Sequence, residues 1–300
     1  MSEFPAAGFL NHNKPLHLTS HDVVAHVRRE YRTLTGSRKV GHAGTLDPLA
    51  EGVLVICLGA ATRLSEYIMR GRKTYRAKIT LGAATSTYDA AGEFVEGKPA
   101  ERLSLSDIQR VLPQFIGDIE QAPPMYSAIK VGGKKLYELA RQGKTIERNP
   151  RAVTIHAIAA HSWRSPVLEL EIECGSGVYI RSLAHDLGAT LGVGGYLSGL
   201  IRTASGAFKI GDSLSLDSIT ADGEWLHHII SPYDALGDYT RVRLKTEEIE
   251  NLRYGRFIRR PPDMADHTVF AFDATNRLVA VLEPRAEFWK PRKVFLSEAI

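Results

Sequence analysis

The chain has 300 residues, of which 44% are hydrophobic and 24% charged, with two cysteines and a formal net charge of +4. These values exclude collagen-like, disordered and disulfide-rich chains and predict a globular protein of about two domains. No signal peptide and no apolar run of about 18 residues is evident, so the sequence predicts no membrane span.

Hydrophobic periodicity predicts helices and strands in the first half of the chain. Ser20 can cap a helix that runs to about Leu34, and the glycine-rich residues 37–52 predict a long structured loop. The remaining elements expected here are a buried strand over 53–58, a helix over 61–69, a half-buried strand over 74–81 and a capped helix over 104–115.

The second half of the chain shows the same kind of hydrophobic periodicity, and its last sixty residues show a different pattern. Strands are expected over 125–131, 152–159, 167–174 and 200–210, helices over 134–142 and 179–191, and a linker near 231–239. The last sixty residues show short apolar–polar alternation with little helix, which predicts a small β-rich domain. We therefore expect a division into residues 1–238 and 239–300.

Basic residues are concentrated in three segments. Residues 1–80 carry 12 Lys and Arg against 6 Asp and Glu, residues 128–151 carry 7 against 2, and residues 239–300 carry 12 against 9. Clustered cations favour a polyanionic partner because they release counterions from phosphates. A solvated surface explains the clustering equally well, so charge alone leaves both alternatives open.

Several familiar catalytic motifs are missing. VGGKK at 131–135 lacks the pattern of a phosphate-binding loop, GVGG at 192–195 follows a helix rather than a strand, and no GxSxG is present. Cys57 and Cys174 lie in apolar runs without histidines at metal-binding spacing, which favours buried thiols in a reducing compartment.

The segment GHAGTLDPLAEGVL, residues 41–54, places a carboxylate on a constrained loop. Pro48 restricts Asp47 to extended backbone, and three glycines let the chain pass close to other groups. Taken alone, Asp47 is better explained as an Asx turn before proline, a common use of aspartate.

Five segments in order give this loop a context: KPLHLTSHDVV, the loop itself, KTYRAKITLG, PPMYSAIKVGGKKLYELARQG and GVYIRSLAHDLG. Over about residues 8–215 the chain resembles the TruB-type tRNA pseudouridine synthases. The resemblance implies an α+β fold with a mixed, mainly antiparallel sheet flanked by helices, followed by a PUA-like RNA-binding domain. It also implies isomerisation of a uridine in the TΨC loop of tRNA, position 55 in tRNA numbering, by a flipped-base mechanism without cofactor or metal.

The resemblance also assigns site residues. The catalytic aspartate corresponds to Asp47, the active-site tyrosine to Tyr75 and the arginine that pairs with the aspartate to Arg181. The expected substrate-binding residues are His42, Tyr179, Leu200, Lys14, Lys130, Lys134 and Lys135, with Arg141 and Lys144 extending the basic cluster. Each of these residues taken singly has an ordinary structural explanation: Tyr75 as a strand residue in the core, for example, or Arg181 as a partner of Asp186.

Three further expectations come from the same comparison of motifs. His17 stands where the family commonly has glycine, which predicts an altered turn beneath the Asp47 loop. A cytoplasmic monomer that binds the T arm of tRNA is expected. Two alternatives stay open: a non-catalytic RNA-binding protein on the same scaffold, and a synthase that acts on ribosomal or messenger RNA.

Overall fold

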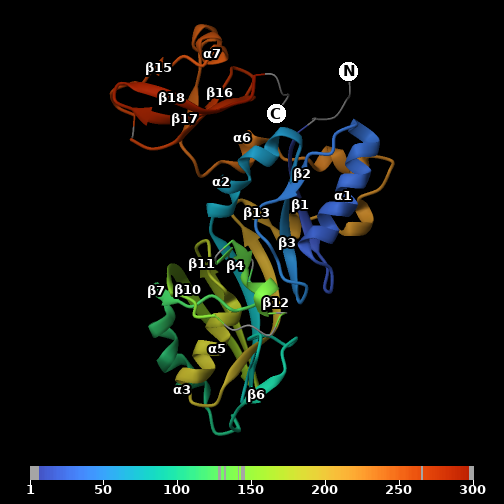
Figure 1. Ribbon diagram of the computed structural model, residues 1–300, viewed down its shortest axis with the longest axis vertical. Coiled ribbons are helices and arrows are strands. Elements are labelled where there is room, and N and C mark those ends of the chain that lie inside the picture. The colour runs from blue at the N-terminus through green and yellow to red at the C-terminus, as the bar shows by residue number, and fades with distance from the viewer. Residues whose placement is uncertain are drawn as a thin grey trace.

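Two β-sheets organise the chain, and the computed structural model describes residues 7–127, 130–131, 133–140, 142, 146–264 and 266–296 (Figure 1). Within these residues nine strands form the larger sheet, in the order β1-β3-β12-β4-β11-β10-β7, with β2 paired to β3 and β13 to β12. Its strands are β1 (Gly8–Lys14), β2 (Val40–His42), β3 (Ala50–Leu58), β4 (Lys73–Leu81), β7 (Gly117–Gln121), β10 (Arg151–Arg164), β11 (Val167–Cys174), β12 (Gly195–Ser205) and β13 (Phe208–Lys209).

Neighbouring strands of this sheet are antiparallel except at one junction, where three residues of β12 pair in parallel with the start of β3. The expected mixed, mainly antiparallel sheet with flanking helices is confirmed. Two small hairpins lie apart from it, β5 (Ala84–Thr85) with β6 (Phe94–Glu96) and β8 (Lys130–Val131) with β9 (Lys134–Lys135).

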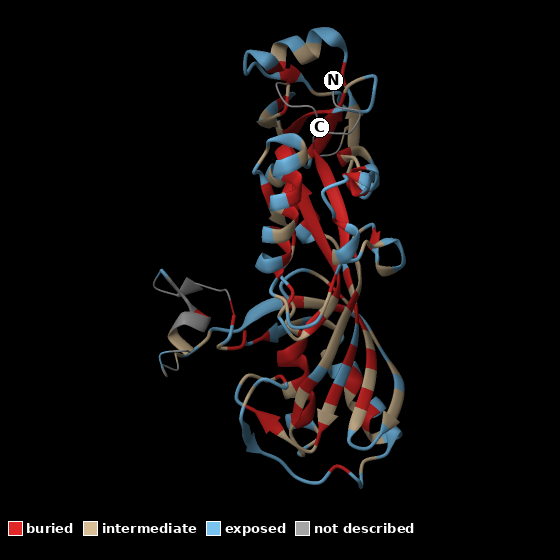
Figure 2. Cartoon of the chain, turned by 90° about the vertical axis from the view of Figure 1, so that its right-hand side faces the viewer, coloured by how far each residue is buried: buried red, intermediate tan, exposed pale blue. Residues whose placement is uncertain are grey.

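One face of the larger sheet is covered by α1 (Ser20–Thr35), α3 (Leu105–Val111) and α5 (Ile180–Thr190). Val23, Val27 and Tyr31 of α1 are fully buried against strands β1 and β3, as their spacing predicted. The helix begins one residue earlier than expected, because Thr19 rather than Ser20 is the cap: its side chain accepts from Asp22 N in a capping box. In Figure 2 the upper strands are buried over most of their length, whereas buried residues alternate with intermediate or exposed ones along the lower strands.

On the other face, the described elements that pack against the sheet lie at the β1–β3 side. There a 3₁₀ turn (Gly59–Leu64), α2 (Ser65–Arg70) and α6 (Pro232–Ala235) pack with the smaller sheet around a second apolar cluster. The expected linker near 231–239 is therefore part of a packed interface: the Tyr239 hydroxyl donates to the Tyr67 carbonyl at 2.7 Å, and its ring lies 4.9 Å from that of Phe270.

The smaller sheet follows this interface, in the order β14-β16-β17-β18-β15 (Figure 1). Its strands are β14 (Arg241–Arg243), β15 (Ile258–Arg259), β16 (Val269–Phe272), β17 (Leu278–Arg285) and β18 (Phe288–Val294). The sequence analysis expected little helix here, but α7 (Thr246–Arg253) spans eight residues and packs Leu252 into the core of this unit.

One predicted strand and one predicted helix are only partly as expected, and β1 was not predicted. Among the described residues of the strand predicted over 125–131, residues 125–127 are not in a strand and Lys130–Val131 form β8. The helix predicted over 134–142 begins with two strand residues and continues as α4 (Leu136–Ala140); Gly143, expected to end it, lies outside the described residues. No helix among the described residues is long and apolar enough to cross a membrane.

His17 occupies a strained turn between β1 and α1. Its φ is +68°, in the left-handed region that favours glycine, and its backbone N–H donates to the Pro48 carbonyl at 2.8 Å. The same turn is held from inside by Lys14, whose ammonium donates to the carbonyls of Pro15 and Leu18, both at 2.7 Å. The turn therefore abuts the Asp47 loop, and a histidine in it carries a backbone cost.

Replacing His17 by glycine is expected to stabilise the protein. The left-handed conformation costs a residue with a side chain about 1–2 kcal/mol, which the greater flexibility of glycine in the unfolded chain offsets only in part. The measurement is the free energy of unfolding in urea. His21→Gly is the matched control, because the same exchange inside α1 should destabilise by about 0.5–1 kcal/mol. Equal losses in both variants would contradict the assigned strain.

Candidate active site

A cleft of about 530 Å³ opens beside the first turn of α5, and Glu66, Met69 and Arg70 of α2 also line it. Segments far apart in the chain line it: the Asp47 loop (residues 43–49), the start of β4, Tyr126 and Ser127, the turn 175–179 before α5, and β12. Five of the residues expected from the sequence are among those that line it: Asp47, Tyr75, Tyr179, Arg181 and Leu200.

Arg181 contacts three other segments of the chain, one of which, at Asp89, does not line the cleft. Its Nε lies 3.0 Å from Asp47 Oδ2, one Nη lies 3.4 Å from Asp89 Oδ2, and the other donates to the Tyr126 carbonyl at 3.0 Å. The Arg181 side chain is only 6% exposed, whereas the Asp47 side chain is 44% exposed and faces the cleft. A buried guanidinium thus presents one carboxylate to an incoming ligand.

The start of α5 is held in place from β7. The side-chain amide of Gln121 donates to the Tyr179 carbonyl at 3.0 Å and its oxygen accepts from the Tyr179 N–H at 2.8 Å. Ser182 adds a hydrogen bond from its hydroxyl to the Ala122 carbonyl. Because Arg181 lies in the first turn of this helix, these hydrogen bonds fix the position of the backbone that carries its side chain.

The Asp47 loop is held from the opposite side. The Ser20 hydroxyl donates to the Leu46 carbonyl and accepts from its N–H, both at 2.9 Å. Arg202 is 2% exposed and donates to the carbonyls of Gly44 at 3.0 Å and Val53 at 2.7 Å. Gly52 lets β3 approach β12 this closely, since a Cβ there would lie 2.3 Å from the Arg202 carbonyl oxygen.

The electrostatics of the cleft are set by burial and by the Arg181 charge. Burial raises the pKa of Asp47, and the nearby Asp89 adds to the rise, while Arg181 and Lys14 oppose it. Arg181 therefore reduces the rise in the pKa of Asp47 but does not reverse it. Burial also raises the pKa of the Tyr75 phenol, so this hydroxyl keeps its proton at neutral pH.

Two expected substrate residues lie elsewhere. Lys14 is fully buried and its ammonium is occupied by the two carbonyls of the His17 turn, so in this structure it serves that turn rather than a substrate phosphate. His42 pairs with Ile56 at the end of β2 and is not among the residues that line the cleft. Burial lowers its pKa, so its ring is neutral at physiological pH.

The expected lysine cluster is described only in part. Lys130 lies in β8, and Lys134 and Lys135 form β9, but their side chains lie outside what the structure describes. Arg141 and Lys144 lie outside the described residues altogether.

The structure adds three residues that the sequence analysis did not single out: Asp89, Arg202 and Lys73. Asp89 is the second carboxylate on Arg181 and also accepts from the Ala91 N–H at 3.0 Å. Lys73 lines the cleft and donates to the Gly71 carbonyl at 2.6 Å, and burial lowers its pKa to about 8.

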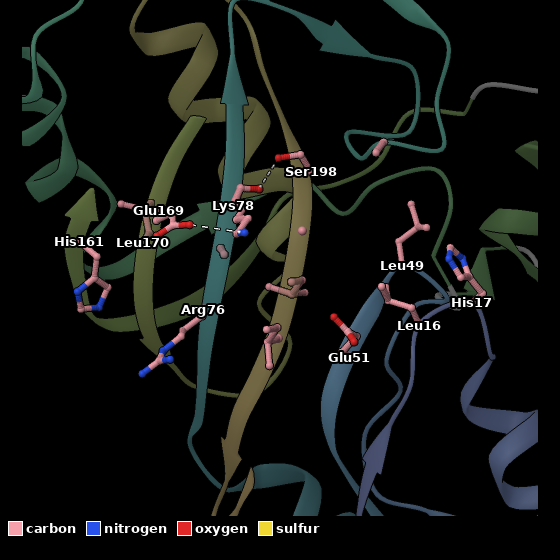
Figure 3. Close-up of a pocket in the computed structure, with 15 residues that line it drawn as sticks. Leu16, His17, Leu49, Glu51, Arg76, Lys78, His161, Glu169, Leu170 and Ser198 are labelled. Atoms are coloured by element: carbon pink, nitrogen blue, oxygen red, sulfur yellow. Dashed lines mark hydrogen bonds and ion pairs between the residues drawn. The ribbon is translucent and has the colours of Figure 1, made fainter. Parts of the chain in front are cut away.

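A larger groove of about 770 Å³ lies on the sheet face that carries Arg76 and Lys78 (Figure 3). Cross-strand ion pairs run along it, Lys78 with Glu169 at 3.6 Å and Arg76 with Glu171 at 4.0 Å. Leu200 lines both the groove and the cleft, so the two adjoin at this residue of β12. The paired charges are typical of a solvated sheet face.

No group of histidine, cysteine and acidic side chains among the described residues is arranged to hold a metal ion. Cys57 and Cys174 are both buried free thiols, and burial raises the pKa of each to about 12. The polar side chains that line the cleft are carboxylates, guanidinium groups, phenols, hydroxyls and an amine: Asp47 and Glu66; Arg70, Arg181 and Arg202; Tyr75, Tyr126 and Tyr179; Thr45, Ser127 and Ser176; and Lys73.

Comparison with known proteins identifies the family of this chain. Residues 32–180 match the model of the TruB family pseudouridylate synthase N-terminal domain, and residues 181–236 match that of the tRNA pseudouridylate synthase B C-terminal domain. A tRNA pseudouridine synthase B of Dehalococcoides mccartyi is 45% identical over 97% of both chains. One from Synechocystis is 48% identical over 80% of this chain and 81% of the relative.

The chain belongs to the TruB family of pseudouridylate synthases and is an isomerase. Solved structures agree on the fold: the matching chain of a Cbf5-Nop10-Gar1 complex aligns with a TM-score of 0.74 at 24% identity, over 96% of this chain and 85% of that one.

Replacing Asp47 by asparagine is expected to stabilise the folded protein at neutral pH. An acid whose pKa is raised on folding contributes stability only while it is protonated, so the ionised Asp47 disfavours folding at pH 7. The advantage of the amide should shrink as the pH falls through the pKa of the folded protein and vanish below about 3.8, the unfolded value. Urea titrations at several pH values measure it. An amide variant that is less stable at pH 7 would mean that Arg181 outweighs burial.

Proposed function

We propose that this enzyme converts a uridine in the TΨC loop of tRNA to pseudouridine, with Asp47 as the reactive carboxylate. The observation that carries the proposal is the Arg181–Asp47 ion pair of 3.0 Å at the base of a cleft that also contains Tyr75. The curated relatives are named as tRNA enzymes and are similar to this chain over most of its length, which supports tRNA as the substrate.

The reaction suits this set of groups. The bond between uracil N1 and the ribose must break, the base must turn, and ribose must join C5; N1 gains a proton and C5 loses one. No electron or phosphoryl group is transferred, so a single ionised carboxylate suffices, whether as nucleophile or as base. Arg181 keeps Asp47 available in that form by opposing the rise in its pKa.

Tyr75 and Leu200 are proposed to receive the base after it leaves its stack. Both line the cleft together with Asp47, and Tyr75 is 8% exposed. An aromatic ring replaces the stacking that a flipped base loses. The phenol, which stays protonated because it is buried, is suited to exchanging a proton with the base.

Residues 239–300 are proposed to form a PUA-like RNA-binding domain. Three aromatic side chains stand exposed on it: Tyr254 at 67%, Phe257 at 41% and Phe288 at 39%. Arginines lie over two of them, Arg256 5.4 Å from the Tyr254 ring and Arg285 5.7 Å from the Phe257 ring. Exposed aromatics beside cations form stacking platforms for unpaired nucleotides.

Asp47→Asn is expected to abolish turnover while tRNA binding is retained, because the amide keeps the shape but not the charge. The assay is tritium release from tRNA labelled at uridine C5, mapped to the T loop. A rate loss above about 100-fold is expected. Asp186→Asn, on the same helix as Arg181 but outside the cleft lining, is the control and should retain activity.

The alternatives give different outcomes in this assay. Wild-type enzyme without release from any RNA would favour the non-catalytic binding protein. Tritium release from ribosomal or messenger RNA but not from tRNA would show that the substrate is one of those RNAs. Substantial turnover by Asp47→Asn would refute the role of Asp47.

The double variant Tyr254→Ala, Phe257→Ala is expected to weaken tRNA binding, by about 1–3 kcal/mol for each lost stack. The rate at saturating tRNA should not change, since the smaller sheet contributes no residue to the cleft lining. Phe94→Ala is the matched control, because Phe94 is 68% exposed on β6. Unchanged tRNA affinity in the double variant would show that these two aromatic side chains do not bind RNA.

A further inference from the structure

Two residues beside the Arg181 ion pairs contact each other through their rings. Tyr88 immediately precedes Asp89, the second carboxylate on Arg181, and His185 follows Arg181 by one turn of α5. The rings of Tyr88 and His185 are stacked, with their centroids 3.9 Å apart and their planes inclined by 15°. The turn that contains Tyr88 and Asp89 therefore meets α5 twice, once through a ring stack and once through an ion pair.

The backbone of Tyr88 lets both contacts form. In an extended segment the side chains of neighbouring residues point to opposite sides, so Tyr88 and Asp89 would not both face α5. Tyr88 instead has a φ of +64°, in the left-handed region. A residue with a side chain rarely takes this conformation, which persists only where the surrounding contacts support it.

Contacts on two sides supply that support. On the side of β12, the Tyr88 carbonyl accepts from the Leu197 N–H at 3.0 Å, and the Ala90 N–H donates to the Leu197 carbonyl at 3.1 Å. On the side of α5, the support is the stack with His185. Burial lowers the pKa of His185, so its ring is neutral at physiological pH. In the described part of the chain its buried Nδ1 has no hydrogen-bond partner, so packing rather than a bond at this atom holds the ring.

The position of the Asp89 carboxylate depends on this turn. Its Oδ1 accepts from the Ala91 N–H at 3.0 Å and from the Thr87 hydroxyl, both within the turn, while its Oδ2 lies 3.4 Å from Arg181. A shift of the turn would therefore carry Oδ2 away from the guanidinium. Because the Arg181 side chain is only 6% exposed, water replaces a lost carboxylate poorly, and the guanidinium would have to move to find another partner.

We infer that Tyr88 and His185 are positioning residues for the isomerisation. Their stack holds the strained turn that places Asp89 on Arg181. Arg181 in turn holds Asp47, so the inference rests on the proposed role of Asp47. Neither Tyr88 nor His185 is among the residues that line the cleft, so each is expected to affect the rate of the reaction rather than the affinity for tRNA.

The first test removes one ring of the stack at a time and measures kcat and KM by tritium release from tRNA. Tyr88→Leu and His185→Leu are each expected to lower kcat by roughly 10- to 100-fold, because a displacement of about 1 Å at the reacting groups costs rate of this order. KM for tRNA should match wild type. Tyr88→Phe keeps the ring and should retain the wild-type kcat.

Tyr196→Leu is the matched control. It removes a half-buried tyrosine ring from β12 beside Leu197, the residue that holds the turn, and leaves the stack intact. Its kcat should match wild type. A wild-type kcat in Tyr88→Leu and His185→Leu, or a loss in Tyr196→Leu as large as theirs, would overturn the inference.

A double-mutant cycle tests whether the stack acts through Asp89. Once Asp89→Asn has been introduced, His185→Leu should lower kcat little further, because the carboxylate that the stack positions has already lost its charge. Losses in kcat that multiply in the double variant would show that His185 acts independently of Asp89 and would contradict the inference.

The free energy of unfolding in urea gives the same cycle without an activity assay. It shows that each variant is folded, and it should be non-additive for His185→Leu with Asp89→Asn. Additive values would count against the inference. Failure of the proposed function has a different signature: wild-type enzyme would release no tritium from tRNA, or Asp47→Asn would retain turnover, while the unfolding cycle still reports whether the stack is coupled to Asp89.

Discussion

The ion pair between Arg181 and Asp47 is the contact on which the site depends, because its guanidinium is buried and must be satisfied from several directions. A buried charge is costly unless it is paired and hydrogen-bonded. Arg181 meets this requirement with the carboxylates of Asp47 and Asp89 and the carbonyl of Tyr126. Three segments far apart in the chain must therefore arrive together, and the correct position of each depends on the other two.

The rest of the fold supplies rigid supports for this contact. Gln121 and Ser182 fix the start of α5, while Ser20 and Arg202 fix the Asp47 loop from α1 and β12. Preorganisation has an electrostatic consequence: the packing that positions Asp47 also raises its pKa, and Arg181 opposes that rise. Stability and reactivity conflict at this residue, since the charge needed for chemistry disfavours folding.

Sequence patterns predicted elements where burial follows hydrophobicity. The alternation of β4 and the apolar stripe of α1 are examples. β1 was missed because its buried residues include Asn11, His12 and Lys14, whose polar groups give no apolar period; Asn11, for instance, donates to the distant Lys209 carbonyl. Lys14 was expected at the substrate-binding surface, but it is buried and its ammonium donates to two backbone carbonyls. Asp89 was missed because a turn aspartate carries no local sign of an arginine 92 residues away.

The most direct test of this account is the acidic limb of the pH–rate profile in wild type and in Arg181→Met. The charge of Arg181 lowers the pKa of Asp47, so its removal should move the midpoint of the limb to higher pH. Asp186→Asn should leave the limb where it is in wild type. An acidic limb in Arg181→Met that coincides with wild type would contradict the claim that this ion pair keeps the reactive carboxylate ionised.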